Sequence, residues 1–375
     1  MKKMRPGSLY CVLLAVVLAC QQHPGTPQAT LETAVLERTR LQIRAGAPVA
    51  GLEGERYFRN VRQLTFGGEN TRAYWSGDGT KLVFQSRRPP FECDQIFVID
   101  LETGEETLAS TGKGRATCAF FLQGDRRILY SSTHLAAAAC PPAVPDYCGR
   151  VARVIDDGCD IFDALPDGSD PRRLTASPGY DSEGSVDPVT GRIVFTSMRD
   201  GDLELYSMEP DGSDVRRLTG RIGYDGGAFY SHDGTKIVLC SGYCGSPAAE
   251  ADHQTPPQQG LVVPRDIQIA VMDRDGGYFH WVTDNGRTNF APFFHPDNER
   301  ILFSSNQDAP DRRDFEIYMI DESGENQVRI TRNPTFDGFP MFSPGGDYLA
   351  FSSNRYGEKP GETNIFVCEW VEAER

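Results

Sequence analysis

From about Val61 onward the chain repeats one pattern of apolar and polar positions. Each copy has a short apolar run, a turn rich in Gly, Asp and Pro, and a second apolar run that ends near a serine. Residues 336–353 show the pattern in full. Short β-branched and aromatic runs between such turns predict strands. Gly and Asn tolerate positive φ and Pro presets the first turn residue, so the turns predict hairpins.

Six copies of this pattern follow one another. Their first strands begin around Tyr74, Phe120, Ser185, Phe229, Phe293 and Met341. A third strand follows each hairpin, and most copies continue into a tight turn and a fourth strand ending in a pair such as Leu218-Thr219. A period in the forties with four antiparallel strands per unit predicts the blades of a β-propeller.

The last copy ends after its third strand, and the start of the repeat region offers the missing strand. Residues 60–65 match residues 214–219, which form a fourth strand in the third copy. A ring of blades must close, because an open sheet edge leaves backbone groups unpaired. We therefore predict an all-β fold, a six-bladed β-propeller with four antiparallel strands per blade, in which the N-terminal strand completes the C-terminal blade.

The first 19 residues have the form of a signal peptide. A basic start precedes an apolar stretch that is too short to span a bilayer. The context of Cys20 resembles a bacterial lipobox, whose cysteine is lipidated; the alternative is ordinary secretion with a chance cysteine. Gln21 would, by the same resemblance, favour the outer membrane. We expect a lipid-anchored tether over residues 20–56, a propeller over 57–375, and an exported lipoprotein on the periplasmic side of the outer membrane or at the cell surface.

The charge of the chain narrows the choice of partners. The formal net charge is −15, and removal of Lys2, Lys3 and Arg5 with the signal peptide makes it −18. A strongly acidic chain without a basic stripe is not a nucleic-acid binder. No shift in composition indicates a second globular domain, and we expect a monomer.

Ten cysteines, eight of them beyond Cys20, predict disulfides in an exported protein. Cys93 and Cys118 flank strands on the same rim and are the expected pair. Cys240 and Cys244 are spaced for a local loop staple, and Cys368 replaces an apolar strand residue, which predicts a buried thiol. The partners of the other three stay open: Cys140, Cys148 and Cys159. Their spacing shows no zinc signature.

Propellers gather the loops before the first strand, and those between the second and third strands, around one mouth of the central channel. In five of the six copies, a carboxylate or amide lies three residues before the Ala, Gly or Pro that opens the first strand. The second copy has Ala116 at this position. These ring positions hold Asn70, Asp181, Asp225, Asn289 and Asp337. Oxygen ligands suit calcium, so Asp181, Asp225 and Asp337 are candidate metal ligands. The alternative is that each side chain caps its own turn.

Other side chains are expected on the same face. Two residues after the serine of the second strand, three blades carry an arginine that could pair with the ring, bind an anion or bridge blades: Arg88, Arg199 and Arg355. The loops 133–158 and 242–266 are long, and long loops on a rigid scaffold often carry function, although they can also be decoration. They contain His134 and His253, the histidine pair that could meet. Neither a G-x-S-x-G nor an H-E-x-x-H pattern occurs.

The repeat resembles that of the TolB-type β-propeller family. Leu218-Thr219, Asp225 and the turns at 230–234 and 342–345 carry the resemblance, which covers the chain after the tether. It implies a periplasmic protein that binds a lipoprotein partner through its propeller face, with ring residues such as Asp181 and Asp337 at the site. The family also has an α/β domain before the propeller, for which residues 20–56 are too few.

Together these features predict a non-enzymatic envelope lipoprotein that acts as a binding or scaffold module for a protein or glycan through its loop-rich face. The alternative is a metal-dependent enzyme, such as a polysaccharide lyase or lactonase-like hydrolase, at the channel mouth. The fold alone does not decide between them. Calcium is the one cofactor that the sequence suggests.

Overall fold

The structure is a computed structural model that describes residues 41–141, 153–243, 261–262, 267–310 and 314–372. These residues form strands and connecting loops, without a helix. In the described ranges no helix is long and apolar enough to cross a membrane.

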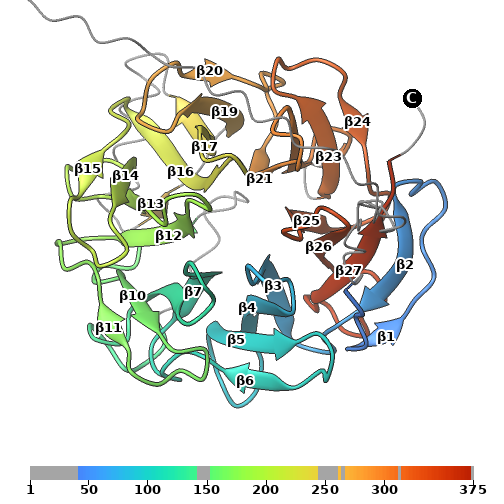
Figure 1. The fold of residues 1–375 in the computed structure, drawn as a ribbon, viewed down its shortest axis with the longest axis horizontal. Coiled ribbons are helices and arrows are strands. Elements are labelled where there is room, and N and C mark those ends of the chain that lie inside the picture. Colours follow the sequence, from blue (N-terminus) through green and yellow to red (C-terminus); the bar gives the residue numbers. More distant parts are fainter. Residues whose placement is uncertain (1–40, 142–152, 244–260, 263–266, 311–313, 373–375) are drawn as a thin grey trace, which may run out of the picture. The chain divides into compact units, whose positions relative to one another are not determined.

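Six sheets lie around a central axis, each with its first strand innermost (Figure 1). The first has β3 (Glu69–Trp75), β4 (Lys81–Arg87), β5 (Gln95–Asp100) and β6 (Glu106–Leu108); the second has β7 (Ala116–Phe121), β8 (Ile128–Ser132), β10 (Asp160–Ala164) and β11 (Arg172–Arg173). The third has β12 (Asp181–Val186), β13 (Ile193–Ser197), β14 (Glu204–Met208) and β15 (Arg216–Arg217); the fourth has β16 (Gly223–Tyr230), β17 (Lys236–Tyr243), β19 (Gln268–Asp273) and β20 (His280–Trp281). The fifth has β21 (Asn289–Phe294), β22 (Arg300–Ser305), β23 (Glu316–Asp321) and β24 (Val328–Arg329); the sixth has β25 (Asp337–Phe342), β26 (Tyr348–Ser353) and β27 (Asn364–Trp370). The predicted all-β, six-bladed propeller is confirmed.

The sixth sheet also contains chain from the N-terminal side. β2 (Phe58–Gln63) pairs antiparallel with β27, and β1 (Ala47–Pro48) adds a fifth strand outside β2. The backbone N–H groups of Arg44 and Ala45 both donate to the Leu101 carbonyl, and Ala45 is buried. The sequence predicts a tether up to residue 56, and residues 44–48 of that range contact the propeller through these hydrogen bonds and through β1.

The second and third strands of every blade are buried on both faces, which explains their continuous apolar runs. Facing aromatic rings from these strands pack in five of the blades: Phe84 with Phe97, Tyr130 with Phe162, Phe195 with Tyr206, Phe303 with Tyr318, and Phe351 with Phe366. Such pairs combine a large buried area with favourable ring geometry. The core therefore lies between neighbouring blades.

Every first strand has a β-bulge, at which its pairing with the second strand shifts. At each bulge one residue has a left-handed backbone with φ between 50° and 59°. These bulge positions hold Arg72, Cys118, Glu183, Gly227, Ala291 and Phe339. A bulge bends the strand and redirects a side chain. Each bulge position follows a ring position by two residues.

The cysteine pairing differs in part from the sequence prediction. Cys93 forms a disulfide with Cys140, with 5.8 Å between their Cα atoms, and Cys118 is a free, buried thiol. The Cys93–Cys118 prediction is wrong because the bulge turns Cys118 into the channel while the blade 2 insertion carries Cys140 to the rim. Cys368 is a buried free thiol, as predicted. Cys240 is buried, and the predicted Cys240–Cys244 staple stays a prediction because Cys244 lies outside the described residues.

Candidate functional site

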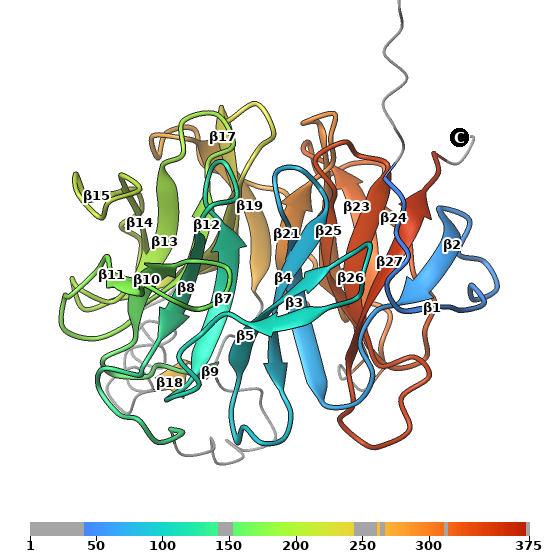
Figure 2. The ribbon, with the colours of Figure 1, turned by 60° about the horizontal axis from the view of Figure 1, so that its bottom comes forward.

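The two long loops, 133–158 in blade 2 and 242–266 in blade 4, which we call the insertions, pair with each other on one face of the propeller. β9 (Arg153–Val154) from blade 2 pairs antiparallel with β18 (Leu261–Val262) from blade 4, with Val154 opposite Leu261. Figure 2 shows this two-stranded sheet at one end of the blades. We call this end the insertion face. His134 lies in the loop that follows β8, and the His134 ring is 4.4 Å from the Phe162 ring. His253 lies outside the described residues, so the proposed histidine pair stays a prediction.

The ring positions lie between blades, in interfaces that we call seams. Asn70, Asp181, Asp225, Asn289 and Asp337 are all buried. The backbone N–H of each donates to a carbonyl that precedes the third strand of the neighbouring blade; for Asp225 the acceptor is Leu203, at 2.9 Å. These residues therefore start each first strand by bonding it to the blade before.

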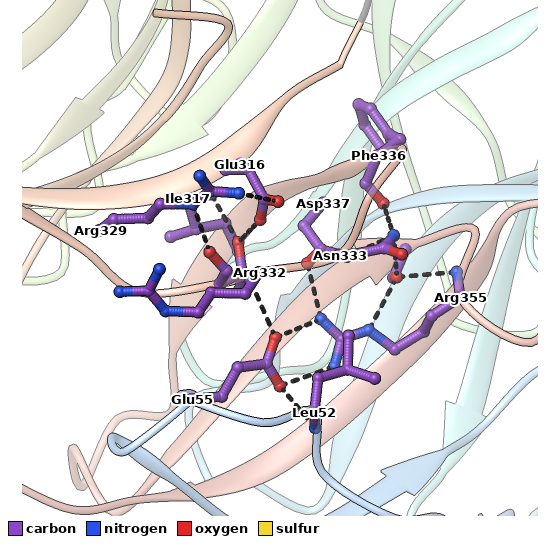
Figure 3. A network of polar contacts seen from close by, with 12 residues as sticks. Leu52, Glu55, Glu316, Ile317, Arg329, Arg332, Asn333, Phe336, Asp337 and Arg355 are labelled. Atoms are coloured by element: carbon purple, nitrogen blue, oxygen red, sulfur yellow. Dashed lines mark hydrogen bonds and ion pairs between the residues drawn. The ribbon is translucent and has the colours of Figure 1, made fainter. Parts of the chain in front are cut away.

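The seam between blades 5 and 6 shows the polar network most fully (Figure 3). Glu316 accepts hydrogen bonds from Thr331 and Arg329, both at 2.5 Å. Asp337 accepts one from Arg355 at 2.6 Å, and the same guanidinium donates to both oxygens of Glu55 at 2.8 and 3.0 Å. Burial raises the pKa of Glu316 to about 7 and that of Asp337 to about 6, although Arg355 opposes the shift at Asp337.

Three other ring positions each accept a hydrogen bond from a side chain of their own blade. Asp181 accepts from Arg199 at 3.1 Å, and Asn289 accepts from the Ser305 hydroxyl at 2.6 Å. Asp225 accepts from Ser241 at 2.5 Å, while its Oδ2 has no hydrogen-bond partner among the described residues. Burial raises the pKa of Asp225 to about 7.

The three predicted arginines each form an ion pair within the propeller. Arg199 and Arg355 each pair with the ring carboxylate of their own blade. Arg88 instead pairs with Glu106 and stacks over the Phe97 ring at 4.1 Å. Each guanidinium thus has a carboxylate partner within the protein, and for Arg199 and Arg355 this partner is the ring residue, one of the alternatives that the sequence left open.

The structure does not bring the three candidate calcium ligands together. Within the described ranges, no group of three or more His, Cys, Asp or Glu side chains is placed to hold a metal ion. Asp181, Asp225 and Asp337 lie in separate seams and accept hydrogen bonds there. Calcium at these residues stays a prediction.

The side chains that line the channel are those of the bulge positions, which sequence reasoning did not single out. Arg72 contacts the Cys118 thiol and lies over the Phe339 ring at 5.1 Å. Glu183 accepts from the Tyr224 hydroxyl and from the Gly227 N–H, both at 2.9 Å. Burial by itself would lower the pKa of Arg72, but Cys118, Tyr74 and Glu183 raise it above its ordinary value. The sequence signal was a fixed offset of two residues after each ring position.

Aromatic rings close the channel beneath these residues. The Tyr74 ring lies 5.4 Å from that of Phe120 and 5.5 Å from that of Phe229, and Phe229 lies 5.4 Å from Phe293. Tyr74 and Phe229 belong to blades 1 and 4, which face each other across the ring. We call these four rings the aromatic floor; Tyr74 and Phe229 also line a small pocket together with Arg72, Cys118 and Glu183.

The pocket continues toward the insertion face as a cavity of about 190 Å³ between blades 1, 2 and 3. Asp94, Arg115 and Asp156 line it together with Arg72 and Glu183. Arg115 donates to Asp156 at 2.8 Å. Burial raises the pKa of both Asp94 and Asp156, and Arg115 opposes each shift. The channel mouth therefore offers charges of both signs over an aromatic floor.

Structural comparison finds this fold in other proteins. The putative TolB from Agrobacterium tumefaciens is 18% identical, with a TM-score of 0.54 over 82% of this chain and 91% of its own. TolB from Acinetobacter baumannii is 16% identical, with a TM-score of 0.49 over 70% of this chain and 54% of its own. An oligogalacturonate lyase in complex with manganese is 15% identical, with a TM-score of 0.46 over 83% of this chain and 93% of its own. No protein-family model and no curated protein matches the chain. The TolB-like propeller is thus confirmed as a fold, and identities this low establish nothing about activity.

Proposed function

We propose that this protein is a non-enzymatic binding module of a bacterial envelope, which recognises a protein or glycan through the channel mouth on its insertion face. The observation that carries the proposal is the opposite placement of two features. The paired insertion strands β9 and β18 lie at one end of the blades (Figure 2), with the charged cavity on the same side, and Leu41, the first described residue, contacts the turns at the other end.

The joining point is fixed by contacts of the first described residues. The Leu41 carbonyl accepts a hydrogen bond from the Tyr348 hydroxyl at 2.7 Å. Gly79 and Pro344 lie beside it, in the turns between first and second strands of blades 1 and 6. Those turns are on the face opposite the insertions. A chain that starts at a lipidated Cys20 would therefore enter the propeller on this face and leave the insertion face free for a partner.

The chemistry of the channel mouth supports binding more than catalysis. Arg72, Glu183 and Arg115 each contact groups of the protein itself, and the aromatic floor limits the depth of the pocket. Charged side chains that are already held by such contacts suit recognition of a complementary surface, because few of them must be ordered on binding.

Site-specific photo-crosslinking in the envelope of the native host tests the proposal. A photoreactive residue replacing Thr117, which lines the cavity, should give a defined adduct. The same residue at Thr80, near the turns on the other face, should not. The double variant Arg72→Ala/Glu183→Gln should lose the Thr117 adduct while it keeps its thermal unfolding midpoint within a few degrees. Metal-dependent depolymerisation of a polysaccharide by the purified protein would instead support the enzyme alternative.

The lipid anchor is a separate proposal with its own test. Metabolic labelling with a fatty-acid analogue should mark the wild-type protein and fail to mark Cys20→Ala. An unlabelled wild-type protein in the soluble fraction would contradict the anchor and leave the binding proposal standing.

A further inference from the structure

A groove between blades 6 and 1 has no part in the site described above. It has a volume of about 580 Å³, which is within the range of small-molecule sites. One wall is the linker from β2 to β3, including Phe66, and the other is the loop from β26 to β27, including Tyr356. Both segments belong to the insertion face. We propose that this groove binds a saccharide segment of a glycan.

Two aromatic side chains converge on the groove. Phe66 is 62% exposed and Tyr356 is 48% exposed, and both line the cavity. Single exposed apolar side chains are common and need no explanation. Two large rings in one groove are different, because each offers an apolar face to a ligand at a low cost in side-chain entropy.

The groove is held rigid by its own hydrogen bonds. The Tyr356 hydroxyl donates to the Ala50 carbonyl at 2.8 Å. The backbone of Tyr356 is left-handed, with φ of 60°. Glu362 accepts from the N–H groups of Gly67 and Glu358, both at 3.1 Å. Gly68 is also left-handed, and a Cβ there would lie 2.9 Å from the Arg87 carbonyl oxygen, so this close approach requires glycine. A preformed groove loses little entropy on binding.

The polar rim favours a saccharide over a strongly charged ligand. Glu69 pairs with Arg87 at the edge, and the rim also has Glu358, Lys359 and Glu362. Carboxylates accept hydrogen bonds and guanidinium and ammonium groups donate them, and a hydroxyl can do both. Three carboxylates against two cations leave little net charge to select a charged peptide. Sugar rings combine such hydroxyls with an apolar C–H face that suits Phe66 and Tyr356.

The proposal shares its face with the proposed partner site but rests on different residues. Saturation-transfer NMR and calorimetry on the full mature protein would use three uncharged probes: a tetramer of N-acetylglucosamine, cellotetraose and mannotetraose. At least one should receive saturation at its ring protons. Phe66→Ala and Tyr356→Ala should each weaken its binding at least tenfold, while Tyr356→Phe, which keeps the ring and loses only the bond to Ala50, should weaken it clearly less.

Tyr278→Ala is the matched control, because Tyr278 is also an exposed aromatic residue with a left-handed backbone and lies in blade 4, away from the groove. It should leave saccharide binding unchanged. Absence of saturation transfer for all three probes would overturn the proposal, as would binding that ignores Phe66 and Tyr356, or binding of a lysine-rich octapeptide in preference to any sugar. The Thr117 crosslink, measured on the same variants, separates failure of the groove from failure of the partner site.

Discussion

Two sets of equivalent residues in the first strands differ sharply in what they do. The ring positions, such as Asp225 and Asp337, are buried in seams and bond one blade to the next. The bulge positions, such as Arg72 and Glu183, follow two residues later and line the channel. In a regular strand, residues two apart share a face. The bulge breaks that rule and separates the two sets of side chains. The ring positions are Asn or Asp in five blades, whereas the bulge positions hold a different residue type in each blade.

The largest effect should come from the best-buried seam charge. Arg355→Ala removes the partner of two buried carboxylates, Glu55 and Asp337. Leaving such charges unpaired typically costs about 3–5 kcal/mol in the free energy of unfolding. Urea unfolding would measure it, with Arg172→Ala as the control. Arg172 and its partner Asp170 are both exposed, so the loss should be at most about 1 kcal/mol; equal losses would show that burial does not set the cost.

Next in size is a pH-dependent effect at the ring position of blade 4. Burial raises the pKa of Asp225 to about 7 in the folded state, above its unfolded value of about 4. The folded state then holds this proton more tightly, so its contribution to stability falls as pH rises from about 4 to about 7 and is constant above that. Asp225→Asn should therefore stabilise the protein at pH 8, by at most about 4 kcal/mol, and much less at pH 5.

The reverse change supplies the control for Asp225. Asn289 occupies the equivalent ring position in blade 5 and accepts a hydrogen bond from a matching serine, Ser305. Asn289→Asp should destabilise the protein at pH 8 more than at pH 5, in urea titrations at both values. A pH-independent response from both variants would mean that neither seam senses ionisation.

The smallest effect concerns the bulge itself. Gly227 and Ala291 have left-handed backbones with φ of 58° and 50°. A Cβ at Gly227 would meet its nearest atom, the Cys240 sulfur, at an ordinary 3.5 Å, so the backbone strain should dominate. Gly227→Ala should lose about 1 kcal/mol of unfolding free energy and Ala291→Gly should gain a similar amount. Opposite signs from this reciprocal pair, measured by urea unfolding, would confirm that the bulge geometry is shared.

The repeat pattern predicted the strands well because each blade is built from local signals. Apolar runs and Gly-rich turns located the first three strands of every blade, and residues 60–65 were matched to the outer strand of the last sheet, where β2 lies. β1 was missed because Ala47 and Pro48 have no strand pattern of their own and pair with an existing edge.

The candidate site was predicted less well, for a geometric reason. The ring residues were expected around the channel mouth but lie in the seams, and the residues that line the channel are the bulge positions. Nothing in the local sequence marks Cys118 or Ala291 as left-handed. The bulge arises from pairing between strands, and it also turned Cys118 away from the predicted disulfide.

The sequence alone determined the all-β fold and the number of blades, because these follow from a period and from turn chemistry that operate over a few residues. Only the tertiary structure decided which side chains face the channel, that Cys93 pairs with Cys140, and that the insertions of blades 2 and 4 pair as β9 and β18. Those outcomes depend on contacts between segments far apart in the chain, and no local pattern encodes them.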